Sequence, residues 1–141
     1  LVRTRSPATA IPFGSSCGPR IRLADWDRPW SGRPWTVHAL AQPSAAPTAL
    51  LLGTSRTTWG STALPLDLGP LGAPGCWLRV PPDLWAPMRR SPAGGFWSLD
   101  LQVPTTLPTG AKVHVQAISI STTNALGVTL SAGRTGQVGR L

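Results

Sequence analysis

The sequence predicts an all-β domain built as an antiparallel two-sheet β-sandwich, and three observations support this. The 141 residues include 15 Gly and 16 Pro, no Glu and a single Lys, so residues that favour exposed helices are scarce. Short stretches alternate apolar and polar residues with the period of a half-buried strand. The segments between them are rich in Pro and Gly, which is typical of turns. The length corresponds to about one domain.

The strand pattern is clearest over Phe96–Val103, where Trp97 and every second residue after it are apolar. Lys112–Ser121 starts with the same alternation, but its apolar phase changes near Gln116–Ile118, which predicts a β-bulge or a strand that changes partners. About eight strands are expected, in an immunoglobulin-like or jelly-roll-like sandwich. The other six are Arg20–Leu23, Trp35–Leu40, Thr48–Thr54, Leu64–Leu68, Cys76–Val80 and Gly127–Ala132.

The two ends differ in composition from the middle. We expect an extended N-terminal arm over residues 1–12, a sandwich domain over 13–133 and a C-terminal tail over 134–141, with neither end needed to complete the sandwich. The first ten residues lack the apolar segment of a signal peptide, so a signal that has already been removed is expected. No stretch approaches the ~20 apolar residues of a membrane-spanning helix. The predicted location is extracellular or at the cell surface.

Cys17 and Cys76 are the two cysteines of the chain. An even number in a chain that looks processed favours one disulfide, which would be worth about 4 kcal/mol in the chain-entropy model. Two free buried thiols are the alternative. His38 and His114 are isolated from each other, and the chain has no CxxC pair, so no zinc site is expected.

The sequence offers little for acid–base or cofactor chemistry. The chain has five Asp and no Glu, and it has no phosphate-binding glycine loop. Asp25 and Asp27 could begin a calcium site, but they have few neighbouring oxygen ligands, and local pairing with Arg22 or Arg28 is favoured. We therefore expect neither an enzyme nor a bound metal or cofactor.

The formal net charge is +8, and 12 of the 13 basic residues are Arg. These Arg are scattered along the chain, and no known nucleic-acid-binding module is present, so no specific nucleic-acid partner is expected. Acidic glycans or a surface polysaccharide stay open as partners.

Seven Trp in a chain without Tyr are an excess of large aromatic residues. Trp35, Trp77 and Trp97 lie on predicted strands and are expected in the core. The others lie in or beside loops, where Trp can stack on a sugar or anchor an interface. The candidates for interface or glycan contact are Trp26, Trp30, Trp59, Trp85, Arg89 and Arg90.

Several motifs resemble a β-sandwich domain found in secreted proteins of planctomycete-type and other GC-rich bacteria. Phe13–Gly14 followed by Cys17–Gly18 is similar to its "FG…GC" opening, and Thr48–Val80 to its "LPLDL…LG.PGC.L" core. Val113–Gly133 resembles its closing hairpin, so the likeness covers about residues 13–133. It implies a β-sandwich, secretion and a Cys17–Cys76 disulfide, and no catalytic residues.

The leading functional hypothesis is a secreted structural protein, one subunit of a self-assembling extracellular filament or surface layer. An extended arm can add a strand to the sheet of a neighbouring copy. The arm residues singled out for this are Leu1, Val2, Arg3, Thr4, Arg5, Ala10 and Ile11. The alternative hypothesis is a carbohydrate-binding or adhesive module.

Overall fold

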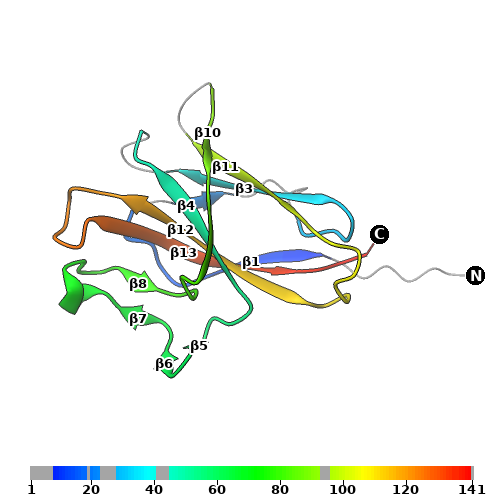
Figure 1. The fold of residues 1–141 in the computed structure, drawn as a ribbon, viewed down its shortest axis with the longest axis horizontal. Coiled ribbons are helices and arrows are strands. Elements are labelled where there is room, and N and C mark those ends of the chain that lie inside the picture. The colour runs from blue at the N-terminus through cyan, green and yellow to red at the C-terminus, as the bar shows by residue number, and fades with distance from the viewer. Residues whose placement is uncertain (1–7, 19, 23–27, 41–44, 93–95, 141) are drawn as a thin grey trace, which may run out of the picture.

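The computed structural model describes residues 8–18, 20–22, 28–40, 45–92 and 96–140. The chain is all-β, with several antiparallel sheets and one short 3-10 helix, η1 (Gly69–Leu71), within those residues. Figure 1 shows the long strands crossing the molecule, with shorter ribbons on one side of them. No helix in the described part of the chain is long and apolar enough to cross a membrane.

The largest sheet has five antiparallel strands in the order β1-β13-β12-β4-β9. Its two longest strands, β12 and β13, are neighbours inside the sheet, and their successive side chains point to its two faces in turn. The strands are β1 (Thr9–Phe13), β13 (Val128–Gln137), β12 (Lys112–Ile120), β4 (Thr48–Gly53) and β9 (Leu84–Pro87).

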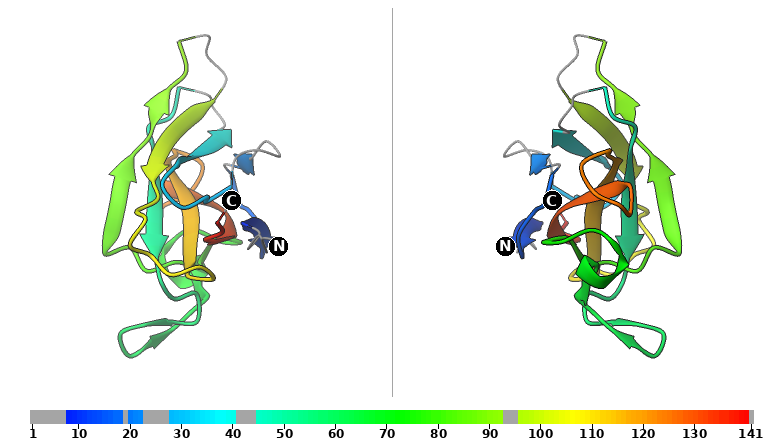
Figure 2. Two further views of the ribbon diagram at one scale, coloured as in Figure 1. Left: turned by 90° about the vertical axis from the view of Figure 1, so that its right-hand side faces the viewer. Right: turned by 90° about the vertical axis from the view of Figure 1, so that its left-hand side faces the viewer.

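A second sheet has four antiparallel strands in the order β10-β11-β3-β2. Figure 2 shows the molecule from its two ends, with this sheet beside the five-stranded one. The strands are β10 (Arg89–Arg90), β11 (Trp97–Gln102), β3 (Pro34–Leu40) and β2 (Arg20–Arg22).

The main core combines side chains from both of these sheets. The four-stranded sheet contributes Trp35 and Val37 from β3, and the five-stranded sheet contributes Leu50 and Val115. Trp35 is 2% exposed, and a Cβ on Gly136 would come within 2.6 Å of its indole ring. The absence of a side chain at that position on β13 therefore makes room for the largest core residue. We call the side of the five-stranded sheet that faces this core its inner face.

Two short ribbons follow β4 in the chain, and the second of them covers the middle of the opposite, outer face of the five-stranded sheet. They are β5 (Thr58–Trp59) with β6 (Thr62–Ala63), and β7 (Leu66–Asp67) with β8 (Trp77–Leu78). Their apolar side chains and those of the sheet form a second core, which is smaller than the first. Its buried members are Leu51, Leu64, Leu68, Ala73, Cys76, Leu78, Val80 and Leu130.

The all-β class predicted from the sequence is confirmed, but the simple sandwich of about eight strands is not. The ribbons add strands that the alternation does not predict, and the sheets are not closed on one another. The predicted strand Leu64–Leu68 is reduced to β7, although Leu64 and Leu68 are both buried on the same core. Paired backbone thus occupies segments too short for their periodicity to be recognised.

The predicted irregularity near Gln116–Ile118 is present, but it has a different cause. The register of β12 against β13 shifts between Gln116 and Ile118, whereas its register against β4 is continuous from His114 to Ser119. Gln116 is the Cα partner of Gly133 and Ile118 that of Leu130, so the extra residue lies on β13. β12 itself keeps its alternation, and only the kind of residue on its outer face changes.

The paired strands extend beyond the domain boundaries expected at residues 13 and 133. β1 pairs with β13 from Thr9↔Gln137 to Phe13↔Gly133, so both ends of the chain contribute to the five-stranded sheet. Arm residues Ala10 and Ile11 lie in β1, whereas Leu1, Val2, Arg3, Thr4 and Arg5 lie outside the described residues. The expectation that neither end contributes to the fold therefore does not hold for residues 9–12 of the arm and 134–137 of the tail, which are paired in this sheet.

Candidate functional site

The outer face of the five-stranded sheet carries two open surfaces, one at each end of the covered middle. The same strands, β12 and β13, pass through both of them. One surface is polar and basic, and we call it the basic groove. The other is apolar and uncharged, and we call it the apolar surface.

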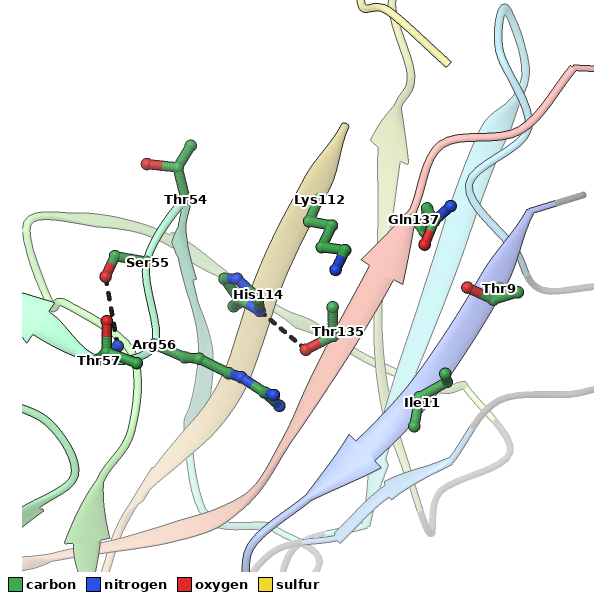
Figure 3. A pocket seen from close by; sticks show the side chains of 10 residues that line it. All are labelled: Thr9, Ile11, Thr54, Ser55, Arg56, Thr57, Lys112, His114, Thr135 and Gln137. Atoms are coloured by element: carbon green, nitrogen blue, oxygen red, sulfur yellow. Dashed lines mark hydrogen bonds between the residues drawn. The ribbon is translucent and has the colours of Figure 1, made fainter. Parts of the chain in front are cut away.

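The basic groove has a floor of side chains from three neighbouring strands, arranged in two rows (Figure 3). The registers place Lys112, Gln137 and Thr9 in the first row, and His114, Thr135 and Ile11 in the second. The loop after β4, residues 54–57, forms a wall on the β12 side. The cavity has a volume of about 360 Å³. It is lined by Thr9, Ile11, Thr54, Ser55, Arg56, Thr57, Lys112, His114, Thr135 and Gln137.

The electrostatic character of the groove follows from its lining. Arg56 and Lys112 are cationic and exposed, and no lining residue is acidic. His114 is 6% exposed, and its Nδ1 is hydrogen-bonded to Thr135 Oγ1 at 2.8 Å. Burial, followed by the charges of Arg56 and Lys112, lowers the pKa of His114, so its imidazole is neutral at pH 7.

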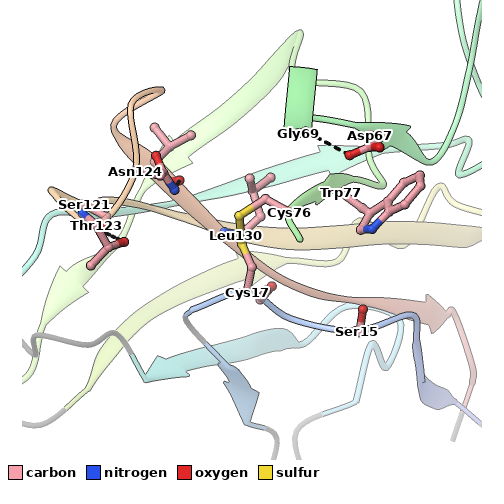
Figure 4. The surroundings of a disulfide bond; sticks show 12 residues. Ser15, Cys17, Asp67, Gly69, Cys76, Trp77, Ser121, Thr123, Asn124 and Leu130 are labelled. Carbon is pink, nitrogen blue, oxygen red and sulfur yellow. Dashed lines mark hydrogen bonds between the residues drawn. A yellow bond between two sulfur atoms is a disulfide. The ribbon is translucent and has the colours of Figure 1, made fainter. Parts of the chain in front are cut away.

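A disulfide holds the covered middle of the outer face in place (Figure 4). Cys17 is bonded to Cys76 with Cα atoms 5.2 Å apart, as the cysteine count and the family resemblance both predict. Cys17 also lies against β13, because its N–H donates to the Leu130 carbonyl at 2.9 Å. The bond therefore ties the end of the β7–β8 ribbon to the sheet beneath it.

Gln116 connects the ribbon to the sheet next to this disulfide. Its side chain is fully buried, and its Nε2 donates to the carbonyls of Trp77 and Ser131, each at 2.8 Å. Its Oε1 accepts a hydrogen bond from the N–H of Arg79 at 2.9 Å. A buried amide with three partners on β8, on the residue after β8 and on β13 fixes the ribbon to one position on the sheet.

The apolar surface begins where β12 passes beyond Gln116. Trp85 and Ile120 are 60% and 59% exposed, and with Ile118 they border a groove of about 270 Å³. No residue in its lining is charged. The lining consists of Pro47, Thr48, Ala49, Trp85, Pro87, Ile118, Ser119, Ile120 and Val128.

β9 is the edge strand beside the apolar surface. It pairs with β4 on one side, and no described strand lies on its other side. Pro87 lies near the end of this strand, and Pro has no N–H to donate to a further strand. Main-chain pairing with another chain could therefore use the edge only up to Ala86, while the exposed Trp85 extends over the sheet face.

The loop Trp proposed as contact residues have different positions. Trp85 is strongly exposed on β9, whereas Trp59 packs partly against the second core and donates from Nε1 to Asp83 at 3.1 and 3.2 Å. Trp30 is half-buried, with its backbone bridged to Gly139. Trp26 lies outside the described residues.

The other residues singled out from the sequence also lie in different parts of the fold. Arg89 and Arg90 are exposed on β10, in the four-stranded sheet and outside both outer-face surfaces. Of the three Trp expected in the core, Trp35 is buried and Trp97 packs against the first core. The prediction for Trp77 is wrong, because its side chain is 36% exposed on the short strand β8.

The basic groove was not predicted from the sequence. Arg56 is one of many scattered Arg, and His114 was considered only as a zinc ligand. The available signal was the alternation of Lys112, His114 and Gln116, which places three polar side chains on one face of a strand. The partners of these residues come from β1, β13 and a loop, and their register is not visible in the sequence.

No group of three or more His, Cys, Asp or Glu residues lies close enough to hold a metal ion among the residues that the structure describes. A comparison with models of known protein families gives no match, and a comparison with curated proteins gives none either. We therefore infer the function from the basic groove and the apolar surface.

Proposed function

We propose that this protein is a secreted, non-catalytic structural module that associates with copies of itself through the apolar surface beside β9. We also propose that the five-stranded and four-stranded sheets are the two halves of a β-sandwich. The all-β fold and the disulfide suit an oxidising, extracellular setting. The motif resemblance to a domain of secreted bacterial proteins points the same way.

The observation that carries the proposal is an exposed, uncharged apolar surface on a strongly basic chain. With a formal net charge of +8, two copies repel each other wherever cationic side chains meet. The lining of the apolar surface contains no charge, so copies can meet there with the least repulsion. Burying apolar area is worth about 25 cal/mol per Å². Trp85 and Ile120 are each more than half exposed, so a contact there would bury a large part of their apolar area.

The mode of contact is set by the edge strand. Leu84 and Trp85, at the start of β9, are 63% and 60% exposed. A large aromatic residue at the centre of an apolar patch is a frequent energetic anchor of protein interfaces. Pro87 limits strand addition to the first part of the edge, so we assign most of the binding energy to side-chain packing.

This replaces the N-terminal arm as the main assembly element. In the single chain, Thr9–Phe13 of the expected arm and its border is already paired with β13. Assembly through these residues would require β1 to exchange between copies. The β9 surface requires no such rearrangement.

The test compares the mass and appearance of matched variants. Sedimentation and negative-stain imaging of the wild type should show oligomers or filaments, whereas Trp85→Ser with Ile120→Ser should give monomers. Leu71→Ser is the control, because Leu71 is 60% exposed on η1 and does not line the apolar surface. A monomeric wild type, or equal assembly of both variants, would refute the proposal.

A further inference from the structure

We propose that the basic groove binds an acidic saccharide, a sugar chain that carries sulfate or carboxylate groups. This inference is independent of self-association, because the groove lies at the other end of the outer face. Its lining combines two permanent cations with a set of neutral polar groups and a few apolar atoms. The cations can bind its acidic groups, the polar groups its hydroxyls and the apolar atoms its sugar rings.

The cations are available for an external anion. The carboxylates of Asp67, Asp83 and Asp100 are hydrogen-bonded to Gly69, Trp59 and Thr36 respectively. None of them lines the groove. Within the described residues, Arg56 and Lys112 therefore face the cavity without a carboxylate beside them in the lining. Bringing an anion into the groove would relieve the repulsion between these two cations.

Arg56 is held over the groove by an aromatic side chain. Its guanidinium carbon lies 4.8 Å from the centroid of the Phe13 ring, within the range of a cation–π contact. The Phe13 ring in turn meets His114 edge-on, with ring centroids 6.0 Å apart. Contact with a ring face positions the guanidinium without using its N–H donors, so these stay available for sulfate or carboxylate oxygens.

Gly133 makes this arrangement possible. It is the Cα partner of Phe13, and a Cβ at Gly133 would overlap the Phe13 ring. The ring therefore occupies the space above the backbone of β13 that a side chain would fill. This places Phe13 next to the row formed by His114, Thr135 and Ile11, where its ring contacts Arg56.

The neutral groups favour a sugar over a free inorganic anion. Hydroxyls of Thr9, Thr54 and Thr135 and the amide of Gln137 line the same cavity, where they can donate to or accept from sugar hydroxyls. Ile11 offers an apolar side chain, 59% exposed, against which a sugar ring can pack. A volume of about 360 Å³ is in the range of small-molecule sites and suits one or two sugar residues of a longer chain.

The experiment measures binding to immobilised polysaccharides at fixed ionic strength. A sulfated polysaccharide and a polyuronate distinguish sulfate from carboxylate as the source of the charge. Neutral dextran and a DNA duplex are the comparison polymers. We expect binding to one or both acidic polysaccharides, weaker binding to DNA and none to dextran. Equal or tighter binding to DNA, or no binding to either acidic polysaccharide, would overturn the proposal.

A pair of charge-matched variants tests the location of the site. Arg56→Gln with Lys112→Gln and the control, Arg33→Gln with Arg140→Gln, lower the net charge by the same amount. All four side chains are exposed, and neither control residue lines the groove. We expect the groove variant to bind about tenfold more weakly than the wild type and the control to stay within about twofold. Equal losses in both would show attraction to net charge alone. Thermal unfolding of each variant checks that the fold is retained.

Discussion

The two ends of the outer face of the five-stranded sheet differ sharply although the same strands build them. Along β12 the outward residues are Lys112 and His114 at one end, and Ile118 and Ile120 at the other. Gln116 lies between them under the ribbon. The strand keeps its alternation throughout, so its inner face stays in the core while its outer face passes through three environments. One strand can therefore serve two different surfaces when a third element covers the stretch between them.

The β7–β8 ribbon separates the basic groove from the apolar surface. It covers the outer face with its own apolar core and is joined to the sheet by a disulfide and by the Gln116 amide. If this division is correct, weakening the ribbon should cost the most stability. Changes at the ends should affect binding or pH dependence more than folding.

Removing the disulfide should have the largest effect. Cys17 and Cys76 are 59 residues apart, and the chain-entropy model gives a loss of about 4 kcal/mol for opening a loop of that size. Urea unfolding of Cys17→Ser with Cys76→Ser measures the free energy of unfolding. The wild type treated with a reductant should give the same value. A loss below about 1 kcal/mol would mean that the ribbon does not depend on this bond.

Gln116→Leu should come next. The substitution leaves the Arg79 N–H and the carbonyls of Trp77 and Ser131 without their side-chain partner. Buried groups left without a hydrogen bond cost about 1–3 kcal/mol each, so we expect a loss of at least about 2 kcal/mol. Gln102→Leu, at an exposed position of β11, should stay within about 0.5 kcal/mol of the wild type in the same measurement.

Gly133→Ala should have a smaller effect on stability and a selective effect on the basic groove. The new methyl group must displace the Phe13 ring, at a cost of about 1 kcal/mol, because that ring lies on an edge strand and can move. The Arg56 guanidinium then loses its support. Affinity for an acidic polysaccharide should fall while self-association stays unchanged. A fall in both would contradict the independence of the two ends.

The pH dependence of stability at His114 should be the smallest effect. The lowered pKa of His114 means that the unfolded chain takes up a proton at a higher pH than the folded one. Stability contributed by the neutral imidazole is thus present above about pH 6.5 and is lost as the pH falls from there through the folded pKa. Unfolding curves of the wild type and His114→Gln should diverge over that range. Parallel curves would show that His114 does not titrate as described.

The same fall in pH should also affect ligand binding at the basic groove. Protonated His114 adds a third cation beside Arg56 and Lys112. Binding of an acidic polysaccharide should therefore strengthen as the pH falls through the same range, and His114→Gln should remove this increase.

The main strands could be predicted because alternation is a local signal, and the disulfide because the chain has only two cysteines to pair. The alternation over Trp97–Gln102 and the apolar run over Thr48–Gly53 match β11 and β4 within about two residues of the expected bounds. β1, β9 and β10 were not predicted. Thr9–Phe13 contains a Pro and too few residues for a clear period, and its strand character comes from pairing with β13. Tertiary context decides such segments.

The two surfaces show the same limit. The sequence identified Trp85 as a contact candidate because it lies beside a loop, where Trp can stack on a sugar or anchor an interface. It could not place Ile118 and Ile120 beside Trp85, because that contact depends on the register of β12, β4 and β9. The sequence likewise offered no reason to connect Arg56 with Lys112 across the chain.

The sequence by itself determined that this protein is all-β, has two cysteines able to pair and carries more positive charge than its five Asp can balance. These properties follow from composition and from short-range alternation, which do not depend on how distant segments of the chain pair. The tertiary structure alone decided which residues share a face. That depends on strand order and register, and on a ribbon that covers the middle of the sheet and leaves a basic groove and an apolar surface at its ends.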